Sequence, residues 1–402
     1  MHLFDLSELL LSGLLIFLLF ISAFLANRIS APDIIIFLLI GIVLAFFVSH
    51  SEILEFAAET GIVLMFFMLG MEFPIKQLKD LALNIYKAGL LDLLLSFGVT
   101  VILVLIMGQP IEIALLLGGV VYATSSSITV KLLEKNNRMT TKDSNFILGL
   151  LVFEDIVSPL LVTIIASLFI GEALSATSLS FVFVKIVLLL VGAILLGQVV
   201  FKKLGAFVEK YVSEDFFILF MVGLSLTYAG IAIQLGLSEV FGAFLAGIMV
   251  AETRKINLLQ QSVRNLRDLL MPIFFINFGL SIQLTSGISM VNVLLVLIVW
   301  SVISKIIVGY VGGKQFGLNN VPAMRAGLSF TQRGEFSMII AGFASTQIKT
   351  LSGVFILISA IIGVTLFQFA PKIAKRLFKK ERKKHLFQVV YKFAICFKSL
   401  IA

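Results

Sequence analysis

The chain has 402 residues, of which 59% are hydrophobic and only 13% are charged, and its mean hydropathy is +1.11. So few polar residues cannot cover the water-facing surface of a soluble protein of this length, so a soluble fold is excluded. The formal net charge of +8 would suggest a nucleic-acid partner in a soluble chain. In a membrane protein the basic residues report instead which loops face the cytoplasm, so we expect no nucleic-acid partner.

Cysteine and histidine are rare in this sequence. The single cysteine, Cys396, excludes an internal disulfide, a Cys-x-x-Cys metal site and an iron–sulfur cluster. The three histidines, His2, His50 and His385, lie outside the long apolar runs, and no Gly-x-Gly-Asp motif of an aspartyl protease is present. The sequence therefore argues against an intramembrane enzyme.

Apolar runs recur along almost the whole chain. A helix needs about 20 apolar residues to cross the hydrocarbon core, and fewer where it is broken or packed inside protein. We expect the first run to be a retained membrane helix, because the residues before it lack the basic start of a signal peptide. The pattern predicts an all-α polytopic membrane protein with thirteen helices, at about 6–26, 34–49, 56–72, 85–107, 112–132, 145–170, 178–201, 216–235, 238–251, 269–284, 290–312, 323–346 and 351–370.

The basic residues orient these helices. With the N-terminus outside and thirteen helices, most of the 31 Lys and Arg residues fall in cytoplasmic loops or in the C-terminal tail, and Lys349 is the one loop residue left outside. One miscounted helix would destroy this asymmetry, because every later loop would change sides. We therefore expect a protein of the cell inner (plasma) membrane with its N-terminus outside and its C-terminus in the cytoplasm.

The two halves of the chain carry a weak internal repeat, as inverted transporter repeats often do. Pairing helices one to six with helices eight to thirteen leaves the helix at about 178–201 as a linker, and the odd separation makes the repeats opposite in orientation. Repeat one covers about 6–170, repeat two covers about 216–370, and 371–402 is a basic cytoplasmic tail. Segments that match at offsets of 206 to 209 residues are Leu39–Ile42 with Leu245–Ile248, Leu69–Met71 with Phe278–Leu280, and Thr124 with Thr331.

Polar residues interrupt two of the matching helices. In the fifth helix Thr124, Ser125 and Ser126 stand between apolar flanks. Hydroxyls there can satisfy backbone groups where a helix unwinds and leave carbonyls free for a cation; close helix packing is the alternative reading. In the twelfth helix Arg333 and Glu335 are costly in an apolar solvent if unpaired, so packing alone does not explain them.

Two adjacent acids, Glu154 and Asp155, lie in the sixth helix. Counted from Asp143 they lie about 16 to 18 Å along the helix, about halfway across a hydrocarbon core of about 30 Å. Neighbouring residues on a helix point about 100° apart, so at most one of them faces a shared ligand directly. Removal from water favours the protonated form of a carboxylate, so we expect at least one of the two to be functional.

Lys305 lies in the middle of the eleventh helix without a charged neighbour in that helix. A lysine inside the membrane implies a nearby acid, and Glu154 or Asp155 is the expected partner. A snorkelling lysine is the alternative. The charged residues near other helix ends are expected at the membrane interface, namely Lys87, Lys185, Glu72 and Glu239.

Four segments in this order resemble the monovalent cation:proton antiporters, the family of bacterial potassium/proton and sodium/proton exchangers. They are Thr124 to Ser127, the Glu154–Asp155 pair, Phe275 to Ile282 and Arg333 to Ser337, and the resemblance runs from about residue 8 to 370. It implies a homodimer of thirteen-helix subunits, each with a panel domain and a mobile core domain. It also implies that helices five and twelve are crossed and unwound, and that Asp155 is the essential aspartate. We expect no cofactor, only transported K+ or Na+ and H+.

The Glu-Asp pair resembles one potassium/proton group of the family more than its charge-moving sodium members, so K+ is the expected cation and Na+ the alternative. Only about 32 residues follow the last helix, too few for the nucleotide-binding regulatory domain of the large potassium efflux members. Either this regulation is absent or a separate cytosolic subunit supplies it. The basic tail is expected to lie on anionic lipids as an amphipathic helix, with subunit docking as the alternative.

These residues predict alternating access in which a proton and a monovalent cation compete at Asp155. Hydroxyls and freed carbonyls of the fifth helix would complete the oxygen shell, and only a neutralised carboxylate could cross the barrier. Arg333 and Glu335 would balance opposed half-helix dipoles, with Lys305 as a further supporting charge. A cation channel or an organic-anion symporter is the alternative class, and the midplane acids argue against an anion carrier.

Overall fold

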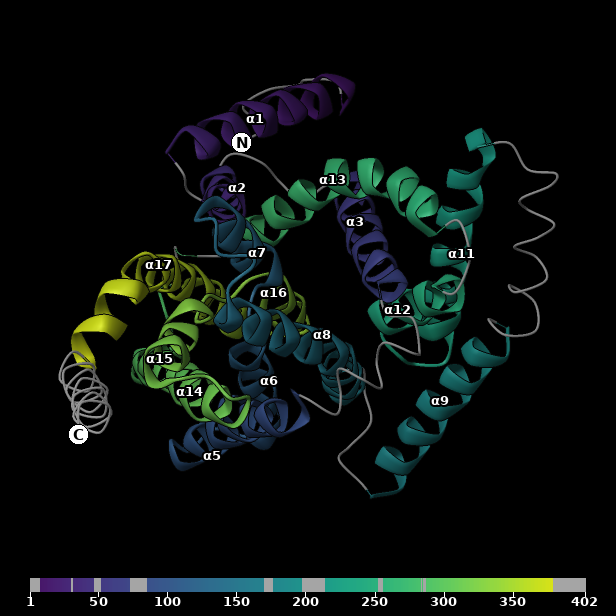
Figure 1. Cartoon of the computed structure of the whole chain (residues 1–402). Coiled ribbons are helices and arrows are strands. Elements are labelled where there is room, and N and C mark those ends of the chain that lie inside the picture. Colours follow the sequence, from purple (N-terminus) through teal and green to yellow (C-terminus); the bar gives the residue numbers. More distant parts are fainter. Residues whose placement is uncertain are drawn as a thin grey trace, which may run out of the picture.

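A computed structural model of the chain describes residues 8–29, 32–46, 52–72, 85–169, 176–196, 214–251, 256–282, 284 and 287–378. All regular secondary structure in these residues is helical (Figure 1). Six helices are long and apolar enough to cross a membrane, and five shorter apolar helices accompany them within the same ranges. Each of the thirteen predicted spans coincides with a helix or a broken helix, so the predicted all-α polytopic fold is confirmed.

The helices of the first half end at a long helix that carries the two adjacent acids. The helix Ile85–Ile106 contains a π-helical turn, η1 (Leu93–Gly98), and ends as α5. The other elements are α1 (Glu8–Ile29), α2 (Asp33–Leu44), α3 (Glu52–Met71), α5 (Val99–Ile106), α6 (Ile111–Tyr122), α7 (Ser126–Lys135) and α8 (Lys142–Phe169).

The second half differs from the predicted boundaries at two helices. The tenth span begins at Ile256 rather than near 269, because the basic segment before the apolar run is already helical. The last helix runs to Leu377 rather than 370, and most of the basic tail, 379–402, lies outside the described residues. The elements are α9 (Ala176–Leu195), α11 (Glu214–Gln234), α12 (Glu239–Val250), α13 (Ile256–Leu280), α14 (Val291–Gln315), α15 (Asn320–Ser329), α16 (Glu335–Gly342) and α17 (Thr346–Leu377).

These helices form two groups, which Figure 1 shows side by side. In one group α3 packs on α12 and α13, α2 packs on α13, and α11 packs on α12. In the other, α14 and α17 pack on α15, while α16 packs on α6. Helix α8 contacts both α6 and α12, so the two acids lie on the helix that adjoins both groups.

Four glycines join the halves of the chain at close helix crossings. A Cβ at Gly279 of α13 would lie 2.8 Å from Cα of Gly41 in α2, and a Cβ at Gly247 of α12 would lie 2.8 Å from Cα of Gly70 in α3. No larger residue fits where backbones approach this closely. Each pair takes one glycine from each half, and these are the four glycines of the matching segments in the sequence.

Two serines at a separation of 208 residues also meet. Ser96 Oγ in η1 donates a hydrogen bond of 3.3 Å to Ser304 Oγ in α14. One turn away, Trp300 Nε1 donates to the carbonyl of Leu95 at 3.0 Å. The separation of 208 residues lies within the range of offsets between the matching sequence segments. Residues at equivalent places in the two halves therefore touch each other here.

Two broken helices cross at the centre of the second group. Helix α6 ends at Tyr122 and α7 begins at Ser126, whereas α15 ends at Ser329 and α16 begins at Glu335. The backbone N–H of Ser125 donates to the carbonyl of Gln332 at 2.9 Å. Gly334 has no side chain because a Cβ there would lie 2.6 Å from Ser125 Cβ. The crossing therefore brings four helix ends together inside the protein.

Candidate functional site

The carboxylate of Glu335 lies at the two helix N-termini of the crossing. It begins α16 itself, and it accepts hydrogen bonds at the start of α7 from Ser125 Oγ at 2.7 Å, Ser127 Oγ at 2.8 Å and Ser126 Oγ at 3.3 Å. Helix N-termini carry partial positive charge, so an anion there is stabilised. The structure thus places the hydroxyls of Ser125 and Ser126, expected around a cation, on Glu335.

Glu154 is fully buried and is held by donors from two directions. The backbone N–H of Thr124 donates to Oε2 at 2.5 Å and Thr124 Oγ1 donates to Oε1 at 3.2 Å. Lys305 Nζ donates to Oε1 at 3.1 Å. Thr124 and Lys305 therefore bind Glu154 itself, and the expected pairing of Lys305 with one of the two adjacent acids is present.

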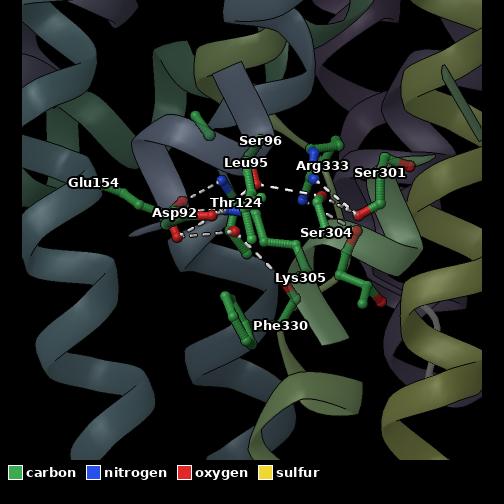
Figure 2. A network of polar contacts seen from close by, with 12 residues as sticks. Asp92, Leu95, Ser96, Thr124, Glu154, Ser301, Ser304, Lys305, Phe330 and Arg333 are labelled. Carbon is green, nitrogen blue, oxygen red and sulfur yellow. Dashed lines mark hydrogen bonds and ion pairs between the residues drawn. The ribbon is translucent and has the colours of Figure 1, made fainter. Parts of the chain in front are cut away.

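Lys305 has a second and closer acidic partner, Asp92, which the sequence reading missed. Lys305 Nζ lies 2.8 Å from both carboxylate oxygens of Asp92, and Figure 2 shows the two side chains facing each other. Asp92 stands alone among apolar residues in the helix Ile85–Ile106, where an acid is as costly as a lysine in the eleventh helix. The argument that gave Lys305 a partner would also have identified Asp92.

Positive charges lie at the opposite, C-terminal helix ends of the crossing. Lys305 Nζ lies 5.4 Å from the ring centroids of Tyr122, which ends α6, and Phe330, which follows α15. Arg333 is fully buried and donates to the carbonyls of Thr331 at 3.2 Å and Ser301 at 3.3 Å. Cations are favourable near helix C-termini. The two N-termini of the crossing therefore have the negative charge of Glu335 beside them, and the two C-termini have the positive charges of Lys305 and Arg333.

Asp155 interacts with Glu154 and Glu335 and shares a side-chain hydrogen bond with Ser126, but its carboxylate lacks a full set of partners. Its side chain is buried, with 6% of the residue exposed, and Oδ1 has no hydrogen-bond partner. Every other buried acidic oxygen in the described part of the chain has a partner or reaches solvent. An unpaired buried carboxylate is strongly unfavourable, so this oxygen calls for a proton or a cation.

A second unpartnered oxygen lies one turn further along α8. Ser158 Oγ is buried and makes no hydrogen bond, whereas Thr163 Oγ1 in the same helix donates to the carbonyl of Pro159 at 2.7 Å. Pro159 has no N–H, so it cannot donate to the carbonyl of Asp155 four residues earlier. Side chains three residues apart share a helix face, so Asp155 and Ser158 are neighbours. The sequence reading missed Ser158, although the Ser-Pro pair after the acids is visible in it.

A separate buried network lies near the start of α8. Asp143 accepts from Arg138 Nη2 at 2.9 Å and from Arg325 Nε at 2.7 Å, and Arg138 also donates to Ser329 Oγ at 3.1 Å. This network ties the turn before α8 to α15. Asp143 has two arginine partners, so its buried carboxylate is fully compensated by protein groups.

Comparisons with known proteins agree with this architecture. A family model described as "Sodium/hydrogen exchanger, transmembrane" matches residues 14–380. The chain is 51% identical to the ammonium/H+ antiporter subunit AmhT of Alkalihalophilus pseudofirmus over 94% of this chain and 96% of that protein. It is 29% identical to the K+/H+ antiporter subunit KhtU of Bacillus subtilis, over 84% of this chain and 85% of that one. The sodium proton antiporter MjNhaP1 of Methanocaldococcus jannaschii has a similar fold, with a TM-score of 0.69, 16% identity, and coverage of 92% of this chain and 99% of that chain.

Proposed function

The chain belongs to the sodium/hydrogen exchanger family and is a multi-pass cation/proton antiporter, and we propose that it exchanges K+ or ammonium for H+ by alternating access. The relatives named for ammonium and K+ support this cation class. Na+ is the alternative cation, since the neighbour that shares the fold is named for sodium. A channel or an organic-anion symporter is disfavoured by the family and by the buried acids.

The unpartnered Oδ1 of Asp155 is the observation that carries this proposal. The neighbouring acids Glu154, Glu335 and Asp92 already accept hydrogen bonds from lysine, hydroxyl or backbone donors. A buried carboxylate without such partners is stable only when a proton or a cation neutralises it. Asp155 is thereby suited to bind the two substrates in turn, and only the neutralised form crosses to the other side.

The oxygen shell of the cation includes atoms of α8 as well as the hydroxyl of Ser126 from the fifth predicted helix, which hydrogen-bonds Asp155. Asp155 Oδ1 and Ser158 Oγ are both buried and unpartnered on one face, and Pro159 leaves the carbonyl of Asp155 without its helical donor. Oxygen atoms suit K+, and they also accept the N–H groups of ammonium. The hydroxyls of Thr124 and Ser125 contribute indirectly, because they fix the two glutamates beside the site.

The remaining charges of the crossing keep a constant state during exchange. Glu335 is held at two helix N-termini, while Lys305 and Arg333 lie at the two C-termini, so the broken helices move as one unit. If Glu154 also keeps its charge, one proton is exchanged for one monovalent cation and no net charge moves.

Assembly and topology follow from the same proposal. We expect a homodimer in the cell inner (plasma) membrane, with the N-terminus outside and the basic tail on anionic lipids of the cytoplasmic face. Both named relatives are called subunits of an antiporter, which supports a separate cytosolic partner for this chain as well.

Proton flux in inside-out vesicles tests the proposal. With a pH gradient imposed, K+, ammonium, Na+ and Li+ are added in turn, and vesicles carrying Asp155→Asn measure the background, including free diffusion of ammonia. We expect K+ or ammonium to dissipate the gradient in the wild type above that background. A response to Na+ or Li+ alone would show that the transported cation is Na+ or Li+ rather than K+ or ammonium. An Asp155→Asn protein that still exchanged would refute the proposed site.

A further inference from the structure

The ammonium group of Lys305 is saturated by two acids. Its three N–H groups face three carboxylate oxygens, two of Asp92 at 2.8 Å and one of Glu154 at 3.1 Å, and all three residues are 0% exposed. Lysine has three donors and no acceptor, so this arrangement uses its full capacity and requires its charged form. The two equal bonds make Asp92 the principal partner.

Asp92 is itself held in place. Ser96 Oγ donates to Asp92 Oδ1 at 2.7 Å and also lies 3.3 Å from Ser304 Oγ, so the contact between the two halves orients the acid. Asp92 immediately precedes the π-helical turn η1, and such turns frequently occur at functional sites. Because Ser96 lies within that turn, the local backbone and the second half of the chain fix the carboxylate together.

The buried charges around Lys305 balance only when Asp92 is counted. The groups that face it are the acids Asp92 and Glu154 and the rings of Tyr122 and Phe330, and Arg333 is the other buried cation that acts on the two acids. Two positive and two negative charges cancel. Without Asp92, Glu154 would face two cations alone.

We propose that Asp92 is a positioning residue that holds the charged Lys305 on Glu154 and thereby limits exchange to one cation for one proton. This inference rests on the proposed exchange at Asp155. With its ammonium shared between two carboxylates, Lys305 keeps its proton throughout the cycle, and Glu154 keeps a constant partner. Asp155 is then the sole group whose proton is exchanged for the cation, so the cycle moves no net charge.

Removing the charge of Asp92 is expected to make exchange move charge. In Asp92→Asn, Lys305 retains one carboxylate and still has Arg333 nearby, so its charged form loses its principal stabilisation. Lys305 then releases and rebinds a proton during the cycle, so two protons are exchanged for each cation and one net charge moves. A potential of 100 mV acting on one such charge changes an equilibrium about 50-fold.

The experiment measures transient current and proton release from proteoliposomes on a solid support, using jumps in the external concentration of K+ and, separately, of Na+. Liposomes with the wild-type protein are expected to release protons without a current above that of empty liposomes. Asp92→Asn is expected to give a current at least tenfold above the wild type, and Asp92→Glu is expected to abolish that current. The double variant Asp92→Asn/Lys305→Gln has no titrating lysine and is expected to exchange without current.

Several results would overturn the inference: a wild-type current as large as that of Asp92→Asn, an Asp92→Asn protein that exchanges protons for the cation without current, or a double variant that carries the same current as the single one. The double variant preserves the net charge of the network, so it remains a test if Asp92→Asn does not fold. Asp155→Asn in the same assay tests the underlying exchange separately. Cation-driven proton release by that variant would refute the proposed site, whatever currents the Asp92 variants give.

Discussion

Helices α8 and α17 have corresponding places in the two halves, but only α8 carries acids at the crossing. Each follows a broken helix, α8 after α6 and α7, and α17 after α15 and α16. On α8 the crossing segment meets Glu154, which accepts the N–H of Thr124. On α17 it meets Gly363, where a Cβ would lie 2.6 Å from Cα of Gln332. At the crossing, α8 therefore contributes the carboxylate of Glu154, whereas α17 contributes a glycine without a side chain.

Under the proposed function, this difference explains why the two halves of the chain form one ion site rather than two. Each half places a long helix after its broken helix, but each buried carboxylate needs its own neutralising partner. Lys305 and Arg333 supply two positive charges, and their helix C-termini are shared between the halves. A second acidic pair on α17 would have no such partners, so the close packing of Gly363 takes its place.

Neutralising the acid of α8 should have the largest effect. Asp155→Asn keeps the shape of the side chain but cannot release a proton or balance a cation, so we expect exchange to fall at least 100-fold. Because Oδ1 makes no hydrogen bond, the fold should be retained. The measurement is proton flux in vesicles, with thermal unfolding of the purified variant as the control. Exchange retained in Asp155→Asn would mean that this acid is not what distinguishes α8 from α17 in function.

Removing the shared cation should destabilise the α8 side of the crossing. Lys305→Met leaves Asp92 and Glu154 buried without their lysine, and breaking a buried ion pair costs about 3 to 5 kcal/mol. The fluorescence of Trp300, the chain's single tryptophan, reports thermal unfolding from one turn away. The double variant Lys305→Met/Asp92→Asn should recover part of the loss. An unchanged midpoint in Lys305→Met would mean that the network contributes little to stability.

The α17 side should respond through packing instead of charge. In Gly363→Ala the new Cβ meets the backbone of Gln332, which cannot move without shifting the crossing, so we expect a loss of about 1 to 3 kcal/mol. Gly342→Ala in α16 is the matched control, because nothing lies within 4 Å of a Cβ there. The cation preference of Gly363→Ala should match that of the wild type. A changed preference would show that α17 also shapes the ion site.

The smallest predicted change distinguishes hydroxyls on the two helices. Ser158→Ala should weaken the apparent affinity for the transported cation about tenfold, which corresponds to about 1.4 kcal/mol and is typical of one lost polar contact. Ser359→Ala on α17 is the control, because its hydroxyl donates to the carbonyl of Ile356 at 3.0 Å. Cation titrations of the exchange rate at fixed pH compare the two. Equal shifts in both variants would remove Ser158 from the proposed shell.

The sequence predicted most of the fold because the position of a residue along a membrane helix follows directly from its place in an apolar run. Apolar runs located the spans, and the broken helices were visible as polar residues between apolar flanks. The direction in which a side chain points across to another helix depends on tertiary packing. Asp92 and Lys305 are 213 residues apart, and although the sequence could have named Asp92 as a candidate, the choice among the buried acids of the nearest partner of Lys305 depends on packing. For the same reason the sequence did not show that the hydroxyls of Ser125 and Ser126 bind Glu335, nor that Ser126 also hydrogen-bonds Asp155.

The glycine pairs that join the two halves also set the order of folding. Gly41 and Gly70 pack against Gly279 and Gly247, which are synthesised about 180 to 240 residues later. At a synthesis rate of about 5 to 20 residues per second, α2 and α3 wait roughly 10 to 50 s in the membrane before their partners exist. During that interval their small-residue faces are open to lipid or to other helices. These contacts between the two halves therefore make completion of the fold a late event in biosynthesis, and we expect chains truncated before α12 to be recognised as incomplete.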